Sequence, residues 1–146
     1  RVMATCFDVA NFFLSKADPE EGELISNLKL QKLVYYAQGF ALAILGEPLF
    51  SDPMEAWEHG PVAPSLYHAY KEHGKNPIPP VGKECIANVF TEDQEKILED
   101  VYQVYGQFSA WKLRDLSHAT DPWDNAYPNG TITHAAMQKY FLTLTV

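Results

Sequence analysis

NLKLQKLVYYAQGFALAIL, residues 27 to 45, is the stretch that decides the fold. At about 100° per residue, most of its apolar side chains fall in one arc of roughly 140°. That arc holds Phe40, Leu33, Ile44, Ala37, Leu30, Ala41, Val34 and Leu45. Because Leu28, Tyr35 and Leu42 lie on the opposite side, the helix is apolar nearly all round, as buried helices are. It is shorter than the roughly 20 apolar residues of a membrane span, and Lys and Gln interrupt it.

The segments around this helix predict further helices and little sheet. Periodicity and capping signals indicate helices over residues 3–16, 65–73, 92–105, 110–117 and 134–142. Residues 48–50 and 54–57, separated by a turn, are expected to pair as a short hairpin, and the proline-rich segment 75–82 to lie extended across the domain. We therefore expect a mainly α fold, in which residues 1–146 form a compact single-domain helical bundle around a buried central helix, with a small β-hairpin.

Composition and charge exclude some functions. The 146 residues are 47% apolar, and the net charge of −8 comes without a clustered basic face, so we expect no nucleic-acid backbone binding by this chain. Such a charge would suit a basic protein partner. Cys6 and Cys85 stand alone in the sequence and are expected to be buried free thiols in a reducing compartment. With no signal peptide or lipidation motif, we expect a cytoplasmic protein with no membrane association.

The histidines do not form a metal or catalytic pattern in the sequence. His68 and His73 are five residues apart and would point to different faces of a helix, so no metal or other cofactor is expected. Ser109, His118 and Asp121 could be written as a triad, but Ser109 is more simply a helix cap. We therefore expect no enzymatic activity.

Two aromatic segments each admit two interpretations. WEHGPV, residues 57–62, is either a rigid recognition corner with Trp57 as anchor or a turn whose side chains fill the core; the second is favoured. In LSHATDPW, residues 116–123, His118 and Trp123 are expected to staple a helix end into the core. Gln31 and Gln38 on the central helix need hydrogen-bond partners, expected near His59 or His118.

Three strings taken together resemble one family, the Panacea (SocA-like) antitoxin domain. They are KLQKLVYYAQGFALAI, EAWEHGPVAPSLYHAYK and LSHATDPW, which occur in the family's order and spacing within a match covering roughly residues 6–142. His59 stands where the family often has Tyr, and Leu116-Ser117-His118 replaces the commoner Leu-Thr-His. Neither change affects the expected fold.

The resemblance implies a bacterial or prophage antitoxin that neutralises a cognate toxin protein by direct binding. The alternative it implies is a proteolytic adaptor that delivers the toxin to a AAA+ protease. Some members carry an added DNA-binding domain, for which this chain is expected to have no length. A hydrolytic enzyme using His59, His118 and Asp121 is the remaining, less favoured hypothesis.

The family motifs supply the candidate site residues, as structural or partner-binding positions. They are Lys32, Tyr36, Gln38, Trp57, His59, Gly60, Pro61, Val62, Tyr67, His118, Pro122 and Trp123. Partner-specific contacts are expected on exposed loops, namely 18–24 and 75–83, or on the tail beyond residue 141.

Overall fold

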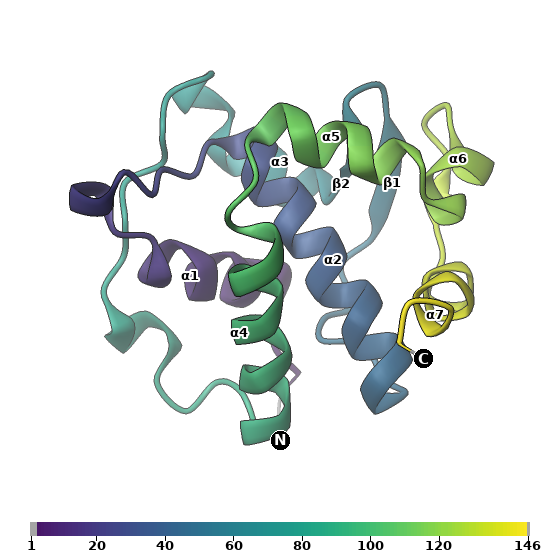
Figure 1. The fold of residues 1–146 in the computed structure, drawn as a ribbon, viewed down its shortest axis with the longest axis horizontal. Coiled ribbons are helices and arrows are strands. Elements are labelled where there is room, and N and C mark those ends of the chain that lie inside the picture. The colour runs from purple at the N-terminus through teal and green to yellow at the C-terminus, as the bar shows by residue number, and fades with distance from the viewer. Residues whose placement is uncertain (1–2, 146) are drawn as a thin grey trace.

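A helix of 19 residues, α2 (Asn27–Leu45), runs through the middle of the computed structural model, which describes residues 3–145. Figure 1 shows it crossing the molecule diagonally, with α4 on one side and α7 on the other. The Ser26 hydroxyl accepts the Lys29 N–H at its start, and Gly46 ends it in the left-handed conformation at φ 76°. Residues 1, 2 and 146, which the expected single domain includes, lie outside the described residues.

Within residues 3–145, six further α-helices surround α2. They are α1 (Cys6–Lys16), α3 (Pro64–Tyr70), α4 (Glu92–Tyr105), α5 (Ala110–His118), α6 (Asp121–Ala126) and α7 (His134–Leu142). Short 3-10 turns cover η1 (Pro19–Glu21), η2 (Lys71–His73) and η3 (Lys83–Ile86). Thr91, Ser109 and Thr133 each accept a backbone N–H at a helix start, so the expected role of Ser109 as a cap is confirmed. Helix α6 was not predicted, since it is only six residues long.

The small sheet has the strand order β2-β1-β3, with both pairs antiparallel. Its strands are β1 (Met54–Trp57), β2 (Gly60–Val62) and β3 (Thr131–Ile132). The predicted pairing of residues 48–50 with 54–57 is therefore wrong. Trp57 pairs with Gly60 across a two-residue turn, which the positive φ of Gly60 allows.

The proline-rich connection lies across the domain, as predicted. The Ile78 N–H donates to the Ile25 carbonyl at 2.8 Å, and the Val81 N–H donates to the Leu14 carbonyl at 3.4 Å. These backbone hydrogen bonds fasten the segment to α1, at Leu14, and to the residues just before α2, at Ile25.

The prediction that α2 is buried on most sides is confirmed. Its fully or nearly fully enclosed apolar residues are Leu30, Leu33, Val34, Tyr35, Tyr36, Ala37, Ala41 and Leu42. Ile44 is the exception, because α2 extends past the core in its last turn and leaves that side chain 56% exposed. Gly39 lets α7 approach, since an added Cβ would lie 2.2 Å from the Phe141 ring.

Candidate functional site

The β1–β2 turn closes over a buried lysine of α2. Lys32 is fully enclosed, and its Nζ donates to the Pro61 carbonyl at 3.0 Å. Burial, and then the nearby charge of Arg114, lower the pKa of Lys32 to about 7. The lysine therefore ties the turn to the central helix at an electrostatic cost.

At position 60 of this turn, only glycine fits without strain. Its φ is +113°, and a Cβ built on it would lie 2.5 Å from Lys32 Cε and 2.9 Å from Ser117 Oγ. The Gly60 backbone therefore packs directly on α2 and α5, which explains why a glycine follows Glu58 and His59.

A chain of buried amides positions the start of α3. Gln31 Oε1 accepts the Ala63 N–H at 2.9 Å, and Gln31 Nε2 donates to Asn27 Oδ1 at 2.9 Å. Asn27 Nδ2 then donates to the Tyr67 carbonyl at 3.1 Å. The network holds α3 against the first turns of α2.

Gln38 does the same for the segment between α2 and β1. Its Oε1 accepts the Leu49 N–H at 2.8 Å, and its Nε2 donates to the Phe50 carbonyl at 2.7 Å. The expectation that the two glutamines find partners near His59 or His118 holds for Gln31, whose partner Ala63 directly follows residues 57–62, and is wrong for Gln38. Both bind mainly to loop backbone, whose buried polar groups have no other secondary-structure partner.

His118 and Trp123 staple α5 and α6 to the end of β1, as expected. The two rings stack with centroids 4.0 Å apart, and Trp123 Nε1 donates to the Trp57 carbonyl at 2.9 Å. Pro122, in the first turn of α6, is buried beside them. Burial and then Arg114 lower the pKa of His118, so the stacked imidazole is neutral at pH 7.

Sequence reasoning missed Trp111 and Arg114 as members of the site. Trp111 is 59% exposed, and the Arg114 guanidinium lies 4.8 Å from the centroid of its ring. Arg114 Nε also donates to His59 Nδ1 at 3.1 Å, and the His59 ring meets Trp111 edge-on. The signal in the sequence was Trp111 itself, a large aromatic residue that lies off the apolar stripe of the predicted helix 110–117.

These elements enclose a groove, here called the aromatic groove, between α2, the β1–β2 turn, α3 and α5. Its volume is about 790 Å³, and its lining includes Leu28, Trp57, His59, Val62, Tyr67 and Trp111. Trp57 and Tyr67 meet edge to face at 5.1 Å. Trp57 is therefore only partly buried, and its ring lines the groove rather than filling the core.

Ten of the twelve predicted site residues lie at three positions in or beside the aromatic groove. Lys32, Trp57, His59, Val62 and Tyr67 line the aromatic groove. Gly60 and Pro61 form the turn above Lys32, and His118, Pro122 and Trp123 support that turn from α5 and α6.

Tyr36 and Gln38 lie away from the groove. Tyr36 stacks on Tyr105 with ring centroids 4.1 Å apart, which joins α2 to α4. Burial raises the pKa of Tyr36, so this side chain remains a neutral part of the core.

The three residues of the hydrolase hypothesis do not form a catalytic arrangement. Among the described residues, no hydrogen bond joins any two of His59, His118 and Asp121, because His59 faces Arg114 and His118 stacks on Trp123. Ser109 accepts the Lys112 N–H as a helix cap.

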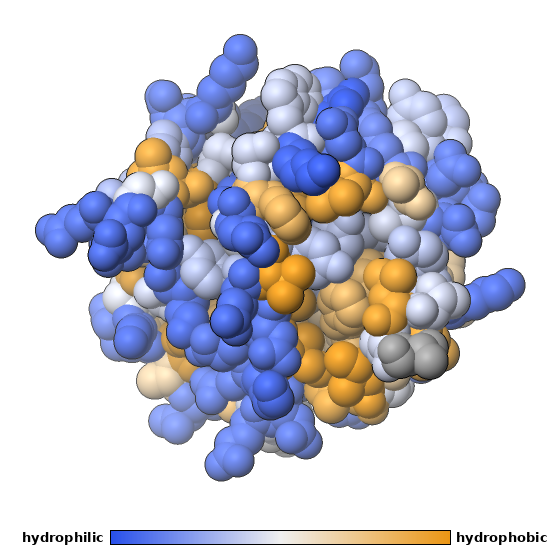
Figure 2. Space-filling model, viewed as in Figure 1, coloured by the Kyte–Doolittle hydropathy of each residue, from blue (hydrophilic) through white to orange (hydrophobic). Residues whose placement is uncertain are grey.

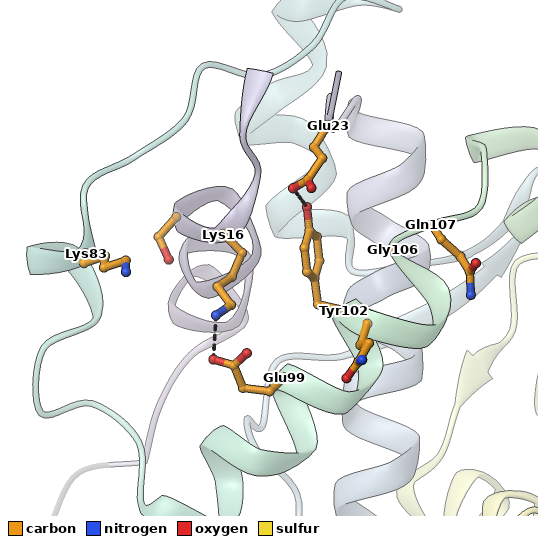
Figure 3. A pocket seen from close by; sticks show the side chains of 9 residues that line it. Lys16, Glu23, Lys83, Glu99, Tyr102, Gly106 and Gln107 are labelled. Carbon is orange, nitrogen blue, oxygen red and sulfur yellow. Dashed lines mark hydrogen bonds and ion pairs between the residues drawn. The ribbon is translucent and has the colours of Figure 1, made fainter. Parts of the chain in front are cut away.

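A second hollow lies between α1, α4 and the η3 segment (Figure 3). Lys16 Nζ pairs with Glu99 at 2.7 Å, and the Tyr102 hydroxyl donates to Glu23 at 2.8 Å. Burial, and then this hydrogen bond, raise the pKa of Tyr102. Apart from Lys83, the charged side chains that line this second hollow already have partners within the chain. We therefore favour the aromatic groove as the candidate site.

Across residues 3–145, no group of three His, Cys, Asp or Glu side chains is placed to hold a metal ion. In the same part of the chain, no helix has the length and apolar character needed to span a bilayer.

Cys6 is buried, whereas Cys85 is exposed in η3, so the expectation of two buried thiols holds for Cys6 alone.

Comparisons with known proteins agree with the sequence motifs. A family model described as antitoxin SocA-like, Panacea domain, matches residues 30–124, which include most of α2, the β1–β2 turn and α5. Antitoxin SocA from Caulobacter vibrioides (strain NA1000 / CB15N) is 36% identical over 126 residues, covering 80% of this chain. The match covers 66% of that relative, just under two thirds of its length. No solved structure gives a significant match. This chain therefore belongs to the antitoxin SocA-like, Panacea domain family.

Proposed function

We propose that this chain is an antitoxin that neutralises a cognate toxin protein by binding it directly. The observation that carries the proposal is membership of an antitoxin family over residues 30–124, with a relative named as an antitoxin. The structure is compatible with a binding role, because its family motifs build a preformed groove rather than a catalytic arrangement. Partly exposed tryptophans line that groove, and tryptophan is enriched where interfaces derive most of their binding energy.

The proposal places the chain in the cytoplasm, together with its toxin. Both cysteines are free, which suits a reducing compartment. A AAA+ protease would be a second partner only if neutralisation proceeds by delivering the toxin for degradation. No contact in the structure favours that mode over simple binding, so the experiment has to distinguish them.

The test is to express each reading frame that neighbours the gene from an inducible promoter, with and without this chain. One neighbour should arrest growth, and this chain should restore it. The control is Leu98→Asp, because Leu98 is fully buried and a charge there unfolds the core. If no neighbouring product is toxic, or if toxicity persists when this chain is abundant and folded, the proposal is wrong.

Toxin abundance during rescue separates binding from delivery. Direct neutralisation predicts that the level of toxin, followed by immunoblot, stays constant or rises while growth recovers. A level that falls only in hosts with an intact AAA+ protease would replace the proposal with the adaptor mode.

A further inference from the structure

We propose that the aromatic groove binds a segment of the toxin in which apolar anchor side chains are flanked by aspartate or glutamate. This inference rests on the proposed function and adds to it the surface that makes contact and the chemistry of what is bound. Three observations support it: the lining of the groove, the charges at its rim and the occupied edge of strand β2.

The lining is apolar and already held in place. Trp57 and Tyr67 pack edge to face, and Arg114 and His59, which are hydrogen-bonded to each other, both contact the Trp111 ring. An exposed aromatic ring fixed in this way loses little freedom when a partner packs on it. The groove is therefore suited to receive apolar side chains.

The rim has the opposite charge to the rest of the chain. The sequence has 19 acidic and 11 basic residues, yet the exposed charged residues of the lining are Lys71 and Lys75 against one carboxylate, Glu58. Among the described residues, neither Lys71 nor Lys75 belongs to any ion pair. Acidic side chains of a bound segment could therefore pair with the ammonium groups of Lys71 and Lys75, so the two surfaces would be electrostatically complementary. Although the net charge of −8 would suit a basic partner overall, the charge at this site favours an acidic segment.

The mode of binding is through side chains rather than by adding a strand to the sheet. In β2, Pro61 has no N–H to offer, and its carbonyl already accepts Lys32 Nζ. Val62 pairs with Glu55 of β1, and the N–H of Ala63, two residues after Pro61, is taken by Gln31. An extended peptide would therefore find no free backbone groups along this edge.

The chain also offers a natural comparison surface. Figure 2 shows apolar side chains gathered over the C-terminal half of α2, between α4 and α7. Ile44, Val104 and Leu142 are exposed on these three helices. Nothing in the structure indicates what would cover them, so they serve as controls.

The first test uses random peptides displayed on phage and selected against the whole chain. The enriched peptides should combine aromatic or aliphatic residues with Asp or Glu. Trp111→Ala should weaken their binding about 30-fold or more, the loss typical of a central aromatic anchor. Ile44→Ala, which removes an exposed apolar side chain outside the groove, should change it less than about twofold.

Charge reversal at the rim supplies the second readout. Lys71→Glu combined with Lys75→Glu should weaken binding about tenfold at low salt, and the loss should shrink as ionic strength rises. The matched control combines Lys83→Glu with Lys139→Glu, two exposed lysines outside the groove. Failure to enrich any peptide, enrichment of basic peptides, or equal effects of the groove and control variants would overturn the inference.

The same variants separate this inference from the proposed function. If wild type neutralises the toxin and Trp111→Ala does so equally well, the groove is not the docking site, although the antitoxin role stands. If acidic-apolar peptides bind in the groove and wild type neutralises no neighbouring product, the antitoxin role fails while the groove remains a peptide site.

Discussion

Replacing Lys32 with methionine tests whether the ammonium beneath the β1–β2 turn is as costly as its burial implies. The side chain is fully enclosed, and its pKa falls from 10.5 to about 7, mainly through desolvation. Methionine has a similar length and flexibility without the charge. At pH 7 this lowered pKa of Lys32 reduces the free energy of unfolding by about 4 kcal/mol. The variant leaves the Pro61 carbonyl unpaired at a cost of about 1–2 kcal/mol, so we expect it to be about 2 kcal/mol more stable.

The pH dependence follows from the direction of the same shift. In the unfolded chain Lys32 keeps its proton up to about pH 10.5, whereas in the folded chain it loses it near pH 7. The unfolded state therefore binds more protons between these values, and the free energy of unfolding rises with pH. From pH 7 to pH 9 the expected rise from this group is about 2 kcal/mol. The Cys6 thiol acts in the opposite direction at higher pH, because burial raises its pKa to about 11.

Urea unfolding, followed by tryptophan fluorescence at pH 7, 8 and 9, measures this difference directly. The gap between Lys32→Met and wild type should be largest at pH 7 and close as the pH rises. Lys139→Met is the control, because Lys139 is exposed and its loss should leave the wild-type profile unchanged. Parallel pH profiles for wild type and Lys32→Met would refute the reasoning, since they would mean that Lys32 keeps an ordinary pKa.

Three further variants test other parts of the site. Gly60→Ala should cost about 2–5 kcal/mol in urea unfolding. Gly22→Ala, where φ is also positive (+77°) but an added Cβ meets nothing within 4 Å, should cost only about 1 kcal/mol, and equal losses would exclude the steric contact. Trp123→Ala should lower the free energy of unfolding by about 3–5 kcal/mol and Trp57→Ala by about 2 kcal/mol, because Trp123 is 8% exposed and Trp57 only partly buried. The reverse order in melting experiments would contradict this. Gln38→Leu should cost roughly 2–4 kcal/mol and speed proteolysis between α2 and β1, and unchanged proteolysis would count against its anchoring role.

What the sequence predicts well is local. The apolar pattern of residues 27–45 requires burial whatever packs against it, and the Thr91–Gln94 capping box specifies its own helix start. The exposure of Ile44 was not predictable, because it depends on where α7 and α4 stop covering α2.

What the sequence predicts poorly is the choice of partners. Strand 54–57 was recognised, but its pairing depends on Gly60 packing against Lys32, a contact between residues far apart in the chain. Gln31 and Gln38 clearly needed partners, yet backbone acceptors and donors in loops have no side-chain signature. For the same reason Trp111 could be placed on a helix, whereas the groove around it could not be foreseen.

Direct binding is the central claim, and mixing two purified proteins tests it without any other component. The toxin identified by the rescue experiment is titrated with this chain while complex formation is followed by size-exclusion chromatography and toxin activity by its own assay. We predict a stable complex and a loss of toxin activity that saturates with the complex, in the absence of any protease. A toxin that stays fully active with this chain in excess, with the two proteins eluting separately, would contradict the account.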